Sequence, residues 1–161
     1  MISYEQVRQA LRTSTITIII INAISMVITL FGLAGIFFLK SQLENPEFRA
    51  QFSAEQLSLF EVGISPFTIF MSVISLGLVV LTTVLCGFNL SKIKQGTTVS
   101  YVPYIIGIVL YLISIISQLF SQIEPVSMVI VLAELALYGF AFYKAKTLNE
   151  KDKDKTQSIE E

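Results

Sequence analysis

The chain contains no histidine and no tryptophan, and Cys86 is its only cysteine. The lack of histidine excludes His-based metal sites and His general bases. A single cysteine excludes an intramolecular disulfide and a CxxC redox pair, so we expect Cys86 to serve in packing. The only Asp residues, Asp152 and Asp154, stand in a polar tail, which excludes an intramembrane aspartyl protease. We therefore expect a protein that is not an enzyme and needs no cofactor.

Charged residues are also scarce, at 14% of the 161 residues, whereas hydrophobic residues make up 53%. A membrane-spanning helix needs roughly 20 consecutive apolar residues. Four segments meet this requirement: residues 13–39, 64–90, 101–122 and 126–143. The first is too long for the apolar part of a signal peptide, so we interpret it as a retained span. The sequence predicts an all-α integral membrane protein with four spans.

The basic residues are unevenly divided between the two sides of these spans. Nine of the 11 fall on one side: Arg8, Arg12, Lys92, Lys94, Lys144, Lys146, Lys151, Lys153 and Lys155. Only Lys40 and Arg49 fall on the other. The positive-inside rule then predicts cytoplasmic termini, with residues 40–63 and the turn around Glu124 outside. Small size and the absence of disulfides favour a bacterial cytoplasmic membrane. No basic cluster indicates nucleic acid as a partner.

Short motifs predict helix starts outside the spans. Ser3 and Gln6 have the spacing of a capping box, which predicts a short amphipathic helix leading into the first span. Its apolar side would carry Val7 and Leu11, and its polar side Arg8 and Arg12 near lipid phosphates. The ordinary role of such a helix is anchoring at the membrane surface.

The outer loop, residues 41–61, contains Asn45-Pro46 and a second capping-box pair, Ser53 and Gln56, and we expect two brief helices there. Its apolar side suits the rim of the bundle, the outer leaflet or a docking partner. Residues 1–146 are expected to form one membrane domain. The polar tail, residues 147–161, predicts disorder or a frayed helical extension.

Small and polar residues recur at steps of three and four within the spans. In chain order the four stripes contain Thr15, Asn22, Ser25, Thr29 and Gly32; Ser65, Thr68, Ser72, Ser75, Thr82, Cys86 and Asn89; Tyr104, Gly107, Tyr111, Ser114, Gln118 and Ser121; and Ser127, Glu134 and Ala141. A sustained 3.5-residue period predicts helices that supercoil with a left-handed twist. Short connections make consecutive helices antiparallel neighbours. The fold class is therefore an up-and-down four-helix transmembrane bundle with a polar seam inside it.

Glu134 is the one ionisable carboxylate in the spans, and charged groups at that depth usually mark functional sites. No Lys, Arg or His lies in any span to pair with it. Burial without a cation favours the neutral acid, so we expect Glu134 to be protonated and hydrogen-bonded. Candidate partners near its depth are Tyr111, Ser114, Asn22, Ser25, Ser75 and Tyr138.

Two interpretations of the seam stay open. In the first, it fixes helix register in an accessory, scaffold or protective (immunity-like) protein, which would contact the lipid bilayer and a larger membrane complex or a second copy of itself. In the second, the protein is a small proton-coupled transporter or channel, and Glu134 exchanges a proton for a cation or an amphipathic solute.

Two resemblances bear on these alternatives. Leu132-Ala133-Glu134 resembles the short motif around the membrane glutamate of small multidrug transporters, which implies competition between protons and cations for one carboxylate. Those transporters carry the glutamate in their first helix, whereas this chain carries it in the fourth. The layout of four spans with the longest outer loop between the first two is similar to that of claudin-like proteins, but their paired loop cysteines are absent.

Overall fold

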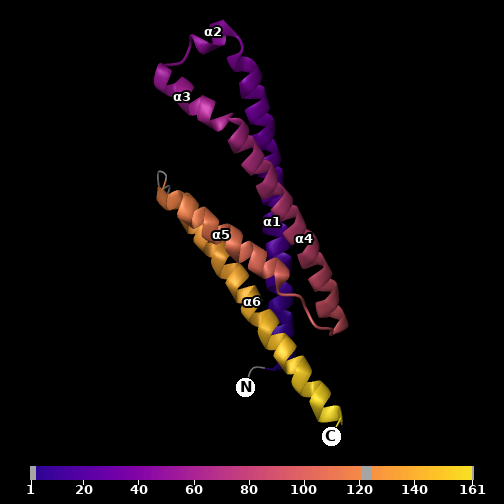
Figure 1. Ribbon diagram of the computed structural model, residues 1–161. Helices are drawn as coiled ribbons and strands as arrows, with labels where there is room; N and C mark the ends of the chain where they lie inside the picture. The colour runs from indigo at the N-terminus through magenta and orange to yellow at the C-terminus, as the bar shows by residue number, and fades with distance from the viewer. Residues whose placement is uncertain (1–2, 121–124, 161) are drawn as a thin grey trace. The chain divides into compact units, whose positions relative to one another are not determined.

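The computed structural model describes residues 3–120 and 125–160, with the side chains of residue 120 and of residues beyond 152 left aside. The chain is about 90% helical. No strand occurs among the described residues. In the part of the chain that the structure describes, four helices are long and apolar enough to cross a membrane (Figure 1). The predicted fold class, an all-α membrane helical bundle, is confirmed. The left-handed twist stays a prediction.

Two predicted spans, residues 13–39 and 126–143, lie within longer helices, whereas the helices at the other two begin two residues and one residue later than predicted, at Pro66 and Val102. The helices are α1 (Tyr4–Leu43), α2 (Pro46–Arg49), α3 (Ala54–Gly63), α4 (Pro66–Gln95), α5 (Val102–Phe120) and α6 (Pro125–Glu160). Ser121 and the predicted turn around Glu124 lie outside the described residues. The polar tail, for which we expected disorder or a helical extension, continues α6 to Glu160.

The chain divides into two compact units. The first contains Met1–Asn22 together with Leu81–Glu161, and the second contains Ala23–Val80. Within the first unit, α5 and α6 lie side by side (Figure 1) and make the most extensive contact between any two described helices. The buried core of this unit includes Leu11, Ile18, Tyr104 and Tyr138.

The N-terminal segment differs from its prediction in two ways. The capping box at Ser3 and Gln6 is present, but no break separates the expected short helix from the first span, and both belong to α1. Val7 and Leu11 are fully buried in the protein core, so their side chains face the protein and not lipid. Their apolar side chains gain more from packing against the first unit than from a partly wet interface.

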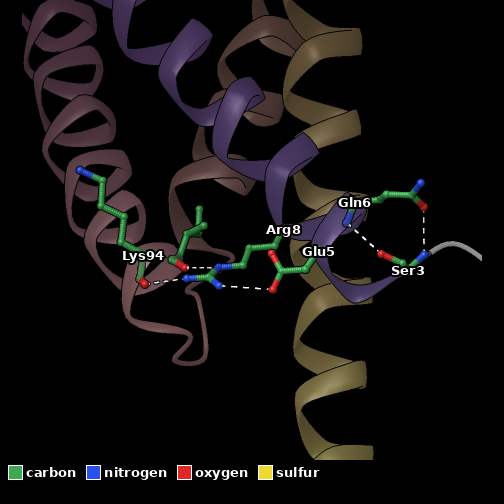
Figure 2. A network of polar contacts seen from close by, with 6 residues as sticks. Ser3, Glu5, Gln6, Arg8 and Lys94 are labelled. Atoms are coloured by element: carbon green, nitrogen blue, oxygen red, sulfur yellow. Dashed lines mark hydrogen bonds and ion pairs between the residues drawn. The ribbon is translucent and has the colours of Figure 1, made fainter.

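Arg8 was expected near lipid phosphates, and the structure shows its hydrogen bonds within the protein. Its Nε donates to the Ile93 carbonyl at 2.8 Å and its Nη2 to the Lys94 carbonyl at 2.6 Å (Figure 2). These carbonyls belong to the last turn of α4, where a helix leaves backbone acceptors without intrahelical donors and where a cation is favoured. Arg8 therefore joins the start of α1 to the end of α4.

The end of α4 and the connection to α5 are fixed by backbone hydrogen bonds. Gly96 has a φ of 70°, and the amides of Gly96 and Thr97 donate to the Ile93 and Lys92 carbonyls, as in a Schellman motif. Two asparagines then hold the following backbone. The Asn89 side chain accepts from the Ser100 amide and donates to its carbonyl, at 2.9 and 2.7 Å.

Asn149, from the polar part of α6, holds Val99 in the same way. It accepts from the Val99 amide at 3.0 Å and donates to the Val99 carbonyl at 2.9 Å. Asn149 is buried at 4% exposure, so these two bonds form away from water. The first turn of the predicted tail is therefore part of the folded unit.

The second unit contains the predicted outer-loop helices. Asn45 caps α2 ahead of Pro46, and the Ser53–Gln56 capping box begins α3, so both expected motifs are confirmed. Phe52 makes edge-on ring contacts with Phe48 and Phe60. These rings give the α2–α3 segment an apolar cluster of its own.

Candidate functional site

Glu134 lies on α6 and is half-buried. The hydroxyl group of Tyr111, on α5, is its hydrogen-bond partner. The close packing of α5 against α6 brings these two residues together. The carboxyl group thus finds a polar neighbour within the apolar part of the chain, as the polar stripes predicted.

Tyr138 lies one turn after Glu134 and connects α6 to two other helices. Its ring lies 5.5 Å from that of Tyr111, centroid to centroid, and its hydroxyl group donates to Asn22 Oδ1 at 3.0 Å. Asn22 Nδ2 in turn donates to Thr83 Oγ1 on α4 at 3.1 Å. Glu134, Tyr111, Tyr138, Asn22 and Thr83, which we call the Tyr138 network, draw one polar residue or more from each long helix.

Gly107 makes the central position of this network possible. A Cβ atom at residue 107 would fall 2.7 Å from Cζ of Tyr138 and closer still to two other ring atoms. Only glycine lets the buried Tyr138 ring lie directly against the backbone of α5. Small residues allow such close approach between membrane helices in general.

The other predicted partners lie outside the Tyr138 network. Ser114 is half-buried on α5. Ser25 and Ser75 belong to the second unit, where Ser25 is half-buried and Ser75 exposed. Their depth along the spans suggested proximity, but depth alone does not determine which helix face a residue occupies.

Thr83 was missed, because the stripe on this helix passes through its neighbour Thr82. Thr82 is buried, but it is Thr83 that contacts Asn22. The two residues are adjacent, so a stripe that repeats every 3.5 to 3.6 residues could have included either of them. A second buried pair, Thr15 with Tyr104 at 2.8 Å, joins α1 to α5, and both residues belong to predicted stripes.

The described residues contain no group of three or more His, Cys, Asp or Glu side chains that could hold a metal ion. Two cavities lie beside α1, with volumes of about 460 and 510 Å³, and Glu134 lines neither. The Tyr138 network is thus a set of groups bonded mainly to one another. Comparisons with protein-family models, curated proteins and solved structures found no match to this chain.

Proposed function

We propose that this protein is an accessory or scaffold protein of a membrane, which acts by packing against other membrane helices. The observation that carries the proposal is the internal pairing of the Tyr138 network. Asn22 uses both its amide nitrogen and its carbonyl oxygen, and Tyr138 uses its hydroxyl hydrogen. Groups paired in this way fix helix register and leave few donors for a solute.

The outer faces of the long helices support the same proposal. Phe31, Phe67 and Val126 are exposed at 75%, 72% and 74% respectively, and many other large apolar side chains are exposed along the same helices. Such faces suit lipid, the helices of a larger membrane complex or a second copy of this chain. The α2–α3 segment with its aromatic cluster offers a further contact surface. A protective, immunity-like role would use these same surfaces.

The orientation belongs to the proposal as well. Nine of 11 basic residues on one side favour cytoplasmic termini, which would put α2 and α3 on the outer side. Partners that bind the α2–α3 segment would then approach from outside the cell. A bacterial cytoplasmic membrane suits the compact loops and the single cysteine.

Proton-coupled transport is the alternative, and the partial exposure of Glu134 favours it. A half-buried carboxyl group next to Tyr111 can be reached from outside its unit. Intramembrane carboxylates serve as proton relays in transporters. In this alternative Glu134 would lose its proton when a cation or an amphipathic solute binds.

Glu134→Gln separates the two functions, because the amide keeps the size and the hydrogen bonding of a neutral acid but cannot titrate. The measurement is pH-linked uptake of tetraphenylphosphonium into proteoliposomes, together with native gel analysis of mildly solubilised membranes. An accessory protein should migrate in a complex heavier than its own monomer or dimer, for wild type and variant alike, without protein-dependent uptake. Glu150→Gln, on the exposed side of α6, is the matched control.

Uptake that is present in wild type and in Glu150→Gln but lost in correctly folded Glu134→Gln would refute the accessory proposal. A solitary monomer or dimer in native membranes would also count against it. Glu134→Leu measures how much Glu134 contributes to stability, since it removes the bond to Tyr111. We expect that variant to lose about 1 kcal/mol of stability, the usual size of a hydrogen bond between membrane helices.

A further inference from the structure

The cavity of about 460 Å³ lies between the first turns of α1 and the last turn of α4, within the first unit. Its lining residues are Glu5, Arg8, Gln9, Arg12, Ile93 and Lys94. Three of these six carry a positive charge and one carries a negative charge. The cavity therefore favours an anion.

Arg8 lines this cavity, and its side chain is fixed by contacts within the protein. Its guanidinium group is held by the two α4 carbonyls and lies 3.6 Å from the Glu5 carboxylate (Figure 2). These contacts engage each of the three guanidinium nitrogens of Arg8 and offset the charge of Glu5. The Arg8 guanidinium group is thus positioned before any ligand binds.

Arg12 and Lys94 carry the other two positive charges of the cavity. Both side chains are exposed, and neither forms an ion pair with any carboxylate whose side chain the structure describes. Arg12 follows Arg8 by one helical turn, so it lies on the same face of α1. Two cations at one cavity that pair with no described carboxylate form a site for an anionic group.

The depth of these residues in the membrane identifies the anion. Arg12 directly precedes the uncharged run of residues 13–39, and Lys94 stands shortly after the apolar run of residues 64–90. Basic residues at the ends of spans lie at the level of the lipid phosphates. The phosphodiester of a membrane lipid is the anion that this level supplies.

The second cavity extends the site toward the apolar region. Gln9 lines both cavities, and Leu137 and Phe140 of α6 line the second. Two of the three hydroxyl groups in its wall donate to their own helix, Ser14 to the Ala10 carbonyl and Thr17 to the Thr13 carbonyl. The wall is left with mainly apolar surface, which suits an acyl chain.

We propose that these two cavities form a site for an anionic phospholipid, with its headgroup phosphate between Arg12 and Lys94 and an acyl chain beside Leu137 and Phe140. Electrostatic attraction selects an anionic headgroup over a zwitterionic one. The apolar groove selects a lipid over a free phosphate ion. The site is independent of Glu134 and of either function proposed above.

Native mass spectrometry of the full chain in detergent tests the proposal. Short-chain phosphatidylglycerol, short-chain phosphatidylcholine and inorganic phosphate are titrated separately, and the bound fraction gives an apparent dissociation constant for each. The cavity variant is Arg12→Gln with Lys94→Gln. The control variant, Lys92→Gln with Lys146→Gln, removes the same charge at the same end from residues that line neither cavity. Arg8 is left unchanged because it holds α4 in place.

We expect phosphatidylglycerol to bind more tightly than phosphatidylcholine and inorganic phosphate to bind hardly at all. Each basic residue near an anionic lipid surface contributes about fivefold in affinity, so the cavity variant should weaken phosphatidylglycerol binding by about 10- to 30-fold. The control variant should change it by less than about threefold.

Three results would overturn the proposal: equal weakening in both variants, no weakening in either, or inorganic phosphate binding as tightly as phosphatidylglycerol. Circular dichroism and gel filtration of each variant establish that it is folded before titration. A cavity variant that fails to fold is replaced by the single change Lys94→Gln, for which about fivefold weakening is expected.

Discussion

Substitution of Gly107 by alanine tests the packing of Tyr138 against α5. The added Cβ atom would meet the Tyr138 ring at 2.7 Å or less, so the ring has to move. Overpacking of this kind costs about 1–3 kcal/mol. Movement of the ring would also weaken its hydrogen bond to Asn22 and its contact with the Tyr111 ring, each of which contributes about 1 kcal/mol.

Part of this loss in stability is offset, because alanine is a better helix former than glycine by up to about 1 kcal/mol. We expect Gly107→Ala to lower the free energy of unfolding by about 2–4 kcal/mol. The assay is unfolding by sodium dodecyl sulfate in dodecylmaltoside micelles, followed by far-UV circular dichroism because the chain has no tryptophan.

Gly87→Ala is the matched control for this prediction. Residue 87 also lies in a long helix, and a Cβ atom there would meet nothing within 4 Å. That variant should be neutral or slightly stabilised. In a Tyr138→Ala background the ring is gone, so Gly107→Ala should cost less than about 0.5 kcal/mol. The reasoning is refuted if Gly107→Ala is as mild as Gly87→Ala, or if its cost persists without the ring.

Three further predictions concern side-chain hydrogen bonds and one turn. Tyr138→Phe removes only the bond to Asn22 and should cost about 1 kcal/mol in the same unfolding assay; an unchanged stability would mean that the bond contributes nothing. Gly96→Ala puts a side chain at a φ of 70°, so we expect a loss of about 1 kcal/mol, and a gain would contradict the Schellman geometry. Asn149→Ala leaves the Val99 backbone groups without partners and should cost about 2 kcal/mol and speed hydrogen exchange at that amide, whereas unchanged exchange would argue against the contact.

The predicted spans agree with the structure because hydrophobicity and helix capping act locally. A run such as residues 13–39 has no charge and no proline, so nothing interrupts the helix. The capping boxes at Ser3 and Ser53 formed as expected, since each needs only residues three positions apart. The short helix expected before the first span proved continuous with it in α1, because the apolar run marks the span and not the ends of the helix.

Arg8 shows where this local reasoning stops. The sequence predicts a position for it at the membrane surface, near lipid phosphates. In the structure Arg8 donates hydrogen bonds to two carbonyls at the end of α4, which lie 85 and 86 positions further along the chain. No spacing rule connects residues that far apart. Asn149 and Val99, 50 positions apart, are paired for the same reason.

The sequence by itself determined that this protein has four apolar helices, that their polar residues recur at helical steps and that Glu134 lacks a cation within the spans. These properties depend on composition and on spacing along single helices. Only the tertiary structure decided that Tyr111 meets Glu134, that Tyr138 lies against Gly107 and that Thr83 contacts Asn22. Those choices depend on which helix faces meet and how closely their backbones approach, and a periodic stripe leaves both undetermined.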